Sequence, residues 1–466
     1  KKEIEIINFY KKKYQEFNTE IKKEKYFFLS SLNFFKKKYM IRNIFYKFFL
    51  FLYNKNYIKS KKGNFIIVVD NYTLRETAIN LILKGYGIKK INDPKYLKKR
   101  NNINYNLIKR ILLQIEPVID KFIKKKLCKS LQEGFKNLII KKIVFFLEQN
   151  QLSINWWLNN FKKKEFNKIV GVLSNTTTHP AGRSVFSACL IKKIPLFLFQ
   201  HGVSIEICKI NHHRDQISET TYSNITFSYN KTFANLERNN KFKLGKVVPI
   251  GMPREYWNSN KSYNKKSLPF IYISTSVYSG NKFFIENDTD DFLAKFEMNL
   301  IKKVFAKQEN NILYKYYTQV PFYLDEDPII TEVKKYKNIN LYMKNKSLSE
   351  MVKEYRIIIT SRATSTLAWA LMTNKPIIFI DQADSKPLRS EAKKIISPYI
   401  FYFDSKKKNF YKSLSNFLLN GPDFIMNEFK KKKKKYRLKV YKFLQEDGLG
   451  AGTRGADFID NFLKKK

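Results

Sequence analysis

Short, continuous apolar runs alternate with amphipathic stretches in the first half of the chain. Runs without polar interruption are typical of strands buried on both faces of a parallel sheet, whereas apolar residues at three- and four-residue spacing indicate helices. By these criteria we expect strands at residues 64–71, 168–174 and 194–200. We expect helices at residues 74–83, 103–148 and 180–191. Because a strand, a helix and a strand follow one another with short joints over 168–200, this sheet should be parallel.

The same alternation begins again after a polar segment. A strand is expected at residues 246–250, where Gly251, Met252 and Pro253 end it, and the polar stretch 258–268 resembles a linker. Five more strands are expected at residues 269–275, 312–317, 339–342, 356–360 and 377–381. For the tail we expect a lysine-rich helix, a glycine-rich turn and a short helix, at residues 424–445, 448–455 and 456–463. The pattern predicts two successive α/β units with a linker near residue 255.

On this basis we divide the chain into four parts. They are a basic, aromatic helical extension (1–60), an N-terminal Rossmann-like domain (61–255), a C-terminal Rossmann-like domain (256–425) and C-terminal helices that pack back across the domains (426–466). Lys clusters alternate with Phe, Tyr, Ile and Leu in the extension. This composition fits an interfacial membrane helix, and it fits equally well an ordinary helix whose apolar stripe covers the next domain.

The charge of the chain is strongly positive. Its 466 residues include 89 Lys and Arg against 40 Asp and Glu, a net charge of +49. The excess is Lys spread along the whole chain and accompanied by Asn, Ile, Phe and Tyr, residues that A/T-rich codons favour. Specific nucleic-acid binding predicts instead Arg and Lys gathered on one face with stacking partners. We therefore favour attraction to anionic surfaces, including the cytoplasmic membrane leaflet, and keep a basic nucleic-acid-binding protein as the alternative from another class.

The cysteines and the apolar runs argue against three further classes of protein. The three cysteines have no CxxC spacing, so neither a disulfide framework nor a zinc ribbon is indicated. No uncharged apolar run approaches the roughly 18 residues that a membrane span needs.

Ligands of open parallel sheets bind at the carboxyl ends of the strands, so the residues that follow each apolar run are the first candidates. His201 follows the run 194–200, and Gly202 lets the chain turn there. An imidazole facing a cleft can accept a proton near neutral pH, which suits a general base that activates a hydroxyl. The alternative is a histidine hydrogen-bonded inside a loop. A metal site is not expected, because the histidine spacings match no common ligand pattern.

Two further strand-to-helix joints are rich in hydroxyl groups. After the strand at 356–360 come Ser361, Arg362, Thr364, Ser365 and Thr366, just before a predicted helix. Backbone N–H groups of a helix amino terminus, hydroxyls and an Arg together predict a diphosphate site, and simple helix capping would explain the hydroxyls but not the Arg.

The other joint follows the strand at 168–174. Asn175, Thr176, His179 and Arg183 lie there and could bind a polar acceptor, although capping explains much of this segment.

Four segments carry a resemblance to a known family. They are FLFQHGVS (197–204), VVPIGMPR (247–254), IIITSRATSTLAWALMTNKPIIFID (357–381) and DGLGAGTRGADFI (447–459). Their order resembles that of GT-B glycosyltransferases, and more narrowly that of bacterial capsule and surface-polysaccharide transferases related to the CDP-glycerol glycerophosphotransferases. The resemblance covers roughly residues 165–460, and it implies an α/β fold with two Rossmann-like domains that face a cleft. One departure is that many relatives carry Lys-x-His-Pro where this chain has Lys315 to Pro321 without a histidine.

The resemblance implies a metal-independent transferase without a cofactor, whose nucleotide-activated donor binds the second domain. It implies His201 as the catalytic base. Donor contacts are implied for Ser361, Arg362, Thr364, Ser365, Thr366, Gly251 and Arg254. Acceptor contacts are implied for Asn175, Thr176, His179, Arg183, Gln200 and Gly202.

These implications lead to one expected function. It is transfer of a sugar from a nucleotide-sugar donor to a cell-surface polysaccharide or lipid-linked glycan acceptor, in the cytoplasm and peripheral on the inner face of the cytoplasmic membrane. Transfer of a polyol phosphate from a CDP-linked donor is the alternative within the enzyme class, and an inactive scaffold is a third possibility because of the missing histidine. No specific nucleic-acid partner is expected.

Overall fold

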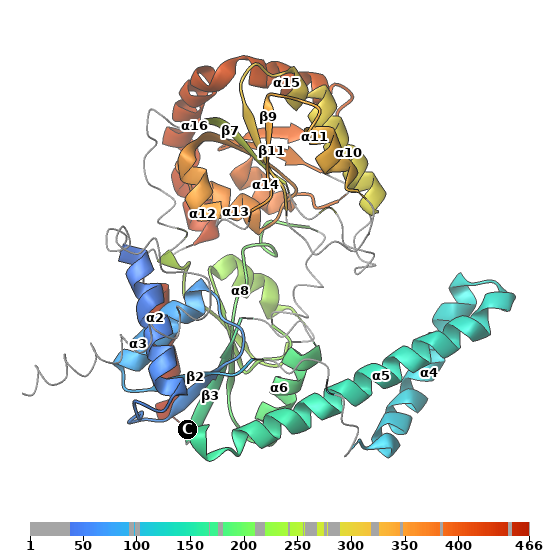
Figure 1. Cartoon of the computed structure of the whole chain (residues 1–466), viewed down its shortest axis with the longest axis vertical. Coiled ribbons are helices and arrows are strands. Elements are labelled where there is room, and N and C mark those ends of the chain that lie inside the picture. The colour runs from blue at the N-terminus through green and yellow to red at the C-terminus, as the bar shows by residue number, and fades with distance from the viewer. Residues whose placement is uncertain are drawn as a thin grey trace, which may run out of the picture.

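The computed structural model describes residues 38–465 apart from several internal gaps. The gaps lie at residues 93–96, 98–102, 167, 176–179, 210–219, 241–242, 255, 257–267, 275–276, 278–288, 318–325, 345–347, 383–384 and 446–449. In Figure 1 the described residues form two α/β domains, one above the other, and a helical hairpin that projects to one side.

The first domain is built on a six-stranded sheet whose strands are all parallel. The strands are β1 (Asn64–Ile67), β2 (Gly87–Lys90), β3 (Ile169–Ser174), β4 (Leu196–Phe199), β5 (Ile225–Ser228) and β6 (Lys246–Pro249). Their order across the sheet is β2-β1-β3-β4-β5-β6, so the direction of chain progression reverses between β1 and β3. At such a reversal the connecting loops diverge and leave a crevice at the carboxyl ends of the strands.

Helices cover both faces of this sheet. They are α2 (Lys38–Asn54), α3 (Tyr72–Leu83), α6 (Pro180–Ile191) and α8 (Lys231–Arg238), with a 3-10 turn at Lys164–Phe166. The aromatic helix α2 packs on this domain through Tyr46 and Tyr53, which are buried in the same apolar cluster as Phe65 and Phe197. Within the described residues, the extension therefore includes a helix that covers the first domain.

The second domain repeats the architecture with another six-stranded parallel sheet. Its strands are β7 (Leu268–Ile273), β8 (Ile312–Lys315), β9 (Ile339–Tyr342), β10 (Tyr355–Ser361), β11 (Ile377–Asp381) and β12 (Phe401–Asp404). The order β12-β11-β10-β7-β8-β9 is that of a Rossmann sheet, with its reversal between β7 and β10. Both sheets confirm the predicted pair of Rossmann-like domains.

Seven α-helices surround the second sheet among the described residues. They are α10 (Asp290–Lys303), α11 (Pro328–Val333), α12 (Leu348–Met351), α13 (Ser365–Leu371), α14 (Ser390–Ile396), α15 (Phe410–Leu419) and α16 (Gly421–Leu444), with 3-10 turns at Phe305–Lys307 and Val352–Glu354.

The final helix, α17 (Ala451–Lys464), leaves the second domain and packs on α3 of the first, so the chain ends beside the first domain (Figure 1). Its glycines permit this close approach. A Cβ atom on Gly452 would lie 2.5 Å from Cβ of Glu76, and one on Gly455 would lie 2.8 Å from Oγ1 of Thr77. The expected glycine-rich turn at 448–455 is therefore wrong from Ala451 onward, because these glycines serve helix packing and do not end a helix.

Helices α4 (Tyr105–Lys126) and α5 (Lys129–Phe161) form the hairpin. The second half of α5 packs on α6 and buries Leu152 and Trp157 in the first domain. The first half of α5 and all of α4 project away from the body of the molecule (Figure 1). No helix in the described part of the chain is both long and apolar enough to cross a membrane.

Aromatic side chains hold the two domains together. Tyr256, from the connection between the domains, stacks on Trp369 of α13 with ring centroids 3.8 Å apart. Tyr72 of the first domain meets the same indole edge-on at 6.2 Å. Side chains of the two domains are therefore packed directly against each other.

Candidate functional site

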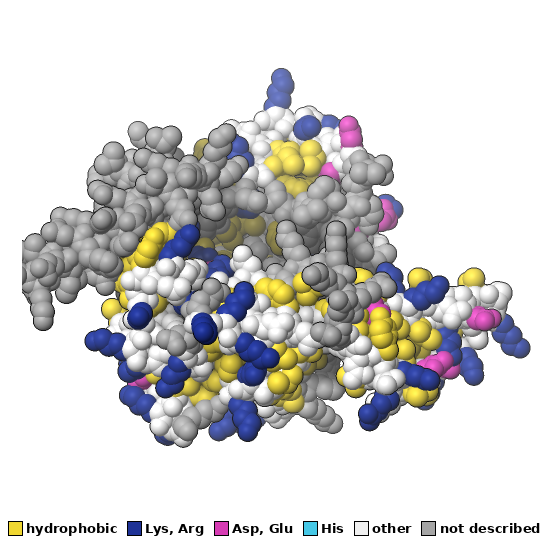
Figure 2. Space-filling model, turned by 60° about the horizontal axis from the view of Figure 1, so that its bottom comes forward, with side chains coloured by type: hydrophobic (Ala, Val, Ile, Leu, Met, Phe, Trp, Pro, Cys, Tyr) yellow, Lys and Arg dark blue, Asp and Glu magenta, His cyan; other side chains and the backbone are white. Residues whose placement is uncertain are grey.

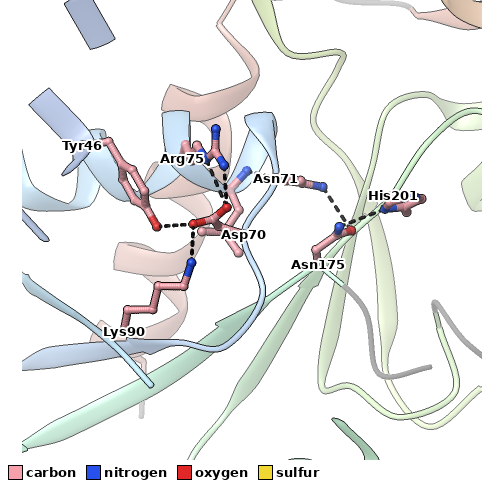
Figure 3. Close-up of polar contacts among 8 residues, drawn as sticks. Tyr46, Asp70, Asn71, Arg75, Lys90, Asn175 and His201 are labelled. Carbon is pink, nitrogen blue, oxygen red and sulfur yellow. Dashed lines mark hydrogen bonds and ion pairs between the residues drawn. The ribbon is translucent and has the colours of Figure 1, made fainter. Parts of the chain in front are cut away.

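The strand reversal of the first sheet brings together three polar side chains. Asn71 follows β1, Asn175 follows β3 and His201 follows β4, so all three lie at the carboxyl edge of neighbouring strands. Asn175 is buried and His201 is exposed. Figure 3 shows the three side chains in a row, joined by hydrogen bonds.

The direction of each hydrogen bond in this row can be worked out from the backbone. The Oδ1 atom of Asn71 accepts the N–H of Leu74 at 2.9 Å as the cap of α3, and its Nδ2 donates to the carbonyl of Gln200 at 2.9 Å. With the Asn71 amide oriented in this way, Nδ2 also donates to Oδ1 of Asn175 at 3.2 Å. The Nδ2 of Asn175 then faces Nδ1 of His201 at 2.9 Å.

An amide NH₂ can only donate, so Nδ1 of His201 is the acceptor in this pair. A neutral imidazole has one donor and one acceptor nitrogen, and the proton of His201 therefore resides on Nε2. We call Asn71, Asn175 and His201 the amide relay.

A second polar cluster, around Asp70, lies next to the amide relay. Asp70 precedes Asn71 and points the opposite way, toward Tyr46, Arg75 and Lys90 (Figure 3). Arg75 donates to Oδ1 of Asp70 at 2.7 Å, and Tyr46 and Lys90 donate to Oδ2 at 3.0 and 3.1 Å. Burial alone would raise the pKa of Asp70, but the two cations hold it below its usual range. The loop that carries Asn71 is thus fixed by α2, α3 and β2 together.

Gln200 lies beneath His201 and is fully buried. Its Nε2 donates to the carbonyl of Gly202 at 3.0 Å and to Oε1 of Glu206 at 2.8 Å, while its Oε1 accepts the N–H of Tyr229 at 2.8 Å. The side chain that we expected to contact an acceptor is therefore engaged in shaping the histidine loop.

Glu206 is the titratable group of this layer. Burial raises its pKa to about 7, although hydrogen bonds from Gln200 and Asn230 oppose the shift. The Nδ2 of Asn230 also donates to the carbonyl of Leu444 at 2.9 Å, which links the layer to the end of α16 in the second domain.

The second domain has its own buried polar group at the reversal of its sheet. The hydroxyls of Tyr272 and Tyr314 donate to the two carboxylate oxygens of Glu297 at 2.6 and 2.5 Å. Tyr272 also lies 3.1 Å from Oγ of Ser361. Burial raises the pKa of Glu297, while the two tyrosine hydroxyls and the charge of Arg362 oppose that shift.

Arg362 follows Ser361 and is only 2% exposed. It adopts a left-handed backbone conformation, with φ of 63°, which is uncommon outside glycine. We expected its guanidinium to contact donor phosphates, but it is buried in the domain, where its charge acts on Glu297. Ser361 and Arg362 are therefore placed beneath the surface loop.

The first turn of α13 is the part of this loop that reaches the first domain. Thr364 is its cap residue, and Ser365 and Thr366 form its first turn, all three half-buried. The Oγ1 of Thr364 is buried and makes no hydrogen bond to any described residue. A buried hydroxyl without a partner is costly and is the kind of group that a bound ligand satisfies.

The candidate sites of the two domains touch at this turn. A Cβ atom on Gly202 would lie 2.9 Å from Cβ of Ser365, so only glycine fits without displacement. Beyond Gly202, the first domain pairs with the second through backbone hydrogen bonds. Arg389 N–H donates to the carbonyl of Ile207 at 2.8 Å, and Lys209 N–H donates to that of Pro387 at 3.1 Å. The histidine loop is therefore held against the second domain.

The crossover segment with Gly251 and Arg254 leads to Tyr256, which stacks on Trp369 of α13. Gly251 has a φ of 95°, which glycine adopts without strain. The backbone N–H of Arg254 donates to Glu76 of α3 at 2.8 Å. Nε of Arg454 in α17 donates to the carbonyl of Ile250 at 2.7 Å. Helices α3 and α17 thus fix the crossover.

Of the remaining predicted residues, one lies within the described part of the chain and two lie outside it. Arg183 is exposed on α6, with its guanidinium 5.5 Å from the ring of Tyr222. Thr176 and His179 lie outside the described residues. In the part of the chain that is described, no three His, Cys, Asp or Glu side chains are placed to hold a metal ion.

Asn71 was not among the predicted site residues, although it directly follows an expected strand. The rule that selected Asn175 and His201 would have selected it as well. Glu206 and Glu297 gave no such signal, because each depends on partners that are distant in the sequence.

No protein-family model matches the sequence, and no curated protein matches it. Among solved structures, UDP-N-acetylglucosamine 2-epimerase from Rickettsia bellii aligns over 86% of this chain and 97% of its own, with 12% identity and a TM-score of 0.50. MurG from Acinetobacter baumannii aligns over 86% and 100%, with 11% identity and a TM-score of 0.42. A UDP-glucosyltransferase from Polygonum tinctorium aligns over 88% and 100%, with 9% identity and a TM-score of 0.45.

The likeness to the Rickettsia protein agrees with the two Rossmann-like sheets, and together they show the fold. The chain has the GT-B architecture that the sequence predicted.

Proposed function

We propose that this protein is a glycosyltransferase that takes a sugar from a nucleotide-activated donor and attaches it to a polysaccharide or lipid-linked glycan. One observation carries the proposal. The polar groups at the strand reversals of both sheets meet where Gly202 contacts Ser365. A ligand held at one reversal is thereby next to a ligand held at the other, as a transfer between two substrates requires.

The donor belongs to the second domain in this proposal. Its phosphates contact the hydroxyls of Thr364, Ser365 and Thr366, and the unpaired Oγ1 of Thr364 is the strongest support. Ser361 and Arg362 position this turn from below, while Gly251 and Arg254 approach the nucleotide from the crossover.

The acceptor belongs to the first domain. Asn175 and His201 contact it directly, and Thr176, His179 and Arg183 line its approach, whereas Gln200 and Gly202 shape the loop. We propose that the reaction needs neither a metal ion nor a cofactor.

In the transfer step, the acceptor hydroxyl oxygen attacks the anomeric carbon and the bond from that carbon to the nucleotide diphosphate breaks. The hydroxyl proton is released to solvent and the diphosphate leaves with the electron pair. A general base at His201 would need its lone pair on Nε2, which is the reverse of the amide relay described above. We therefore propose that His201 donates its Nε2 hydrogen to a substrate oxygen on which negative charge develops.

A thermal-shift screen of the purified protein against CMP, CDP, UDP, GDP and TDP, with and without magnesium, tests donor binding. A nucleotide present at 100 times its Kd stabilises the native state by about 2.7 kcal/mol. We expect one nucleotide to raise the melting temperature without magnesium, and Ser365→Ala to reduce that shift. Ser390→Ala is the matched control, because Ser390 likewise begins a seven-residue helix of the same domain. No shift with any nucleotide would refute the proposal.

The identity of that nucleotide separates the related alternatives. Selective stabilisation by CDP would favour polyol-phosphate transfer of the CDP-glycerol type, and selective stabilisation by UDP, GDP or TDP would favour a sugar donor for capsule or other surface polysaccharide. We further propose that the protein works in the cytoplasm, at the inner face of the cytoplasmic membrane, where such acceptors are anchored. Tight retention of RNA or DNA in a filter-binding assay would favour the nucleic-acid alternative instead.

A further inference from the structure

The projecting hairpin exposes large apolar side chains that no other described part of the molecule covers. On α4, Leu107, Val118 and Phe122 are 43%, 67% and 58% exposed. On α5, Leu131, Phe135 and Leu138 are 58%, 43% and 51% exposed. We call these six residues the hairpin stripes.

Their spacing places each set on one side of its helix. The α5 residues recur at intervals of four and three, which keeps them on a single face. On α4 the separations of eleven and four residues do the same, whereas Leu113, which is 63% exposed, lies on another side of that helix. The buried apolar residues of α4, Ile108, Ile119 and Ile123, are a different set. The stripes are therefore additional to the packing of the hairpin.

Basic side chains accompany the stripes. Residues 105–147 contain ten Lys or Arg and three Asp or Glu. Two of the three acids, Glu116 and Asp120, are paired with Lys136 between the helices, at 2.7 and 2.9 Å. The excess positive charge is thus left to the outer surface, above all to Lys124, Lys125 and Lys126 near the tip. Figure 2 shows hydrophobic side chains next to Lys and Arg on the hairpin.

We propose that the hairpin docks on an anionic lipid surface, with the stripes inserted among the headgroups and the lysines paired with lipid phosphates. Apolar and aromatic residues beside lysines on a helix are the combination that binds at this interface. A second copy of the hairpin would bring two strongly basic surfaces together, so charge complementarity favours lipid over self-association. The proposal does not depend on the transferase reaction, because docking requires no substrate.

Co-sedimentation of the full chain with vesicles tests this proposal. Vesicles of phosphatidylcholine with phosphatidylglycerol are compared with vesicles of phosphatidylcholine alone, at low and high salt and without nucleotide. We expect binding to the anionic vesicles only, and release at high salt.

Two triple variants separate the apolar and the charged contributions. The first variant combines Leu131→Ser, Phe135→Ser and Leu138→Ser. Its partition coefficient between vesicles and water should fall at least tenfold, because burial of about one large apolar side chain already accounts for a tenfold change. Lys124→Gln, Lys125→Gln and Lys126→Gln together should lower it on the order of 100-fold at low salt, since each lysine near an anionic surface contributes roughly fivefold.

Matched controls carry the same changes elsewhere on the surface. Leu83, Leu244 and Leu419 are exposed leucines of the two domains, and all three are replaced by Ser in one control. Lys406, Lys407 and Lys408 are another run of three lysines, and all are replaced by Gln in the other. Both controls should bind vesicles like the unchanged protein, and unfolding curves check that every variant is folded.

Three results would overturn the proposal. In the first, the stripe variant binds anionic vesicles as the unchanged protein does. In the second, neutral vesicles bind equally well. In the third, the unchanged protein forms a dimer in sedimentation analysis that the stripe variant does not form, which would assign the stripes to a second copy of the chain.

Discussion

The amide relay makes a prediction about one atom, the nitrogen of His201 that carries the proton. Asn71→Asp keeps the oxygen that accepts the N–H of Leu74 but removes the NH₂ that faces Asn175. The Asn175 amide should then turn over, so that its NH₂ faces the new carboxylate and its oxygen faces His201. Nδ1 of His201 would have to donate, and the proton of the neutral ring would move from Nε2 to Nδ1.

The stability changes can be worked out from the same contacts. Asn71→Ala loses a helix cap, worth about 1 kcal/mol, and two hydrogen bonds of about 1 kcal/mol each, so unfolding should become easier by about 3 kcal/mol. Asn71→Asp keeps the cap and regains a hydrogen bond to Asn175, while it loses the one to Gln200. We therefore expect a loss of about 1–2 kcal/mol for the Asp variant.

The assay is ¹⁵N NMR of the histidine rings, in which the two tautomers have distinct patterns. The chain has four histidines, and His201→Gln identifies the signal in question. Asn104→Asp is the matched control, because Asn104 caps α4 by accepting the N–H of Leu107 at 3.0 Å and lies on the hairpin, outside the amide relay. An unchanged His201 tautomer in a folded Asn71→Asp variant would refute the assignment of the relay.

Three further predictions concern the interior and the domain contact. Burial raises the pKa of Glu206 from 4.5 to about 7. Between pH 4.5 and pH 7 the native state therefore binds more protons than the unfolded state, and the free energy of unfolding falls as the pH rises through this range. Glu206→Gln should therefore be more stable than the unchanged protein by about 3 kcal/mol at pH 8 and no more stable at pH 4, and parallel stability curves in urea would contradict this. Gly202→Ala places a Cβ atom against Ser365 and should cost about 1–3 kcal/mol, with weaker nucleotide binding in the thermal-shift assay, whereas an unchanged melting temperature would mean that the contact is loose. Trp369→Ala removes the stacking on Tyr256 and should lower stability by about 3 kcal/mol, and a change below about 1 kcal/mol in a denaturant titration would show that the stack contributes little.

Much of the fold could be predicted because buried parallel strands need uninterrupted apolar residues. The runs that became β4 and β10 are of this kind, and their positions were predicted to within two residues. Strands β2, β5 and β12 were missed because polar side chains shorten their apolar runs. Lys89 of β2 is 4% exposed, and its ammonium donates to Asn56 at 2.5 Å. Such a partner from another element makes a buried lysine tolerable, and sequence periodicity does not reveal it.

The candidate site was predicted in position more successfully than in orientation. The carboxyl ends of strands identified Asn175, His201 and the loop with Ser361. They did not reveal that Gln200 and Arg362 point inward, since consecutive residues at a strand end face opposite sides and the chain alone does not say which side is the surface. The roles of these residues stay predictions until the variants above are measured.

The return of α17 to the first domain has a consequence for folding during synthesis. Residues 451–464 complete the apolar cluster around Phe197 and Phe227, yet the ribosome adds them only after the whole second domain. Until α17 is made, part of the apolar interior of the nascent first domain stays exposed to solvent. In this interval some two hundred further residues are synthesised, at about 5–20 residues per second. During those seconds the surface of α3 that α17 later covers stays exposed, and the first domain is completed only after the second has been synthesised.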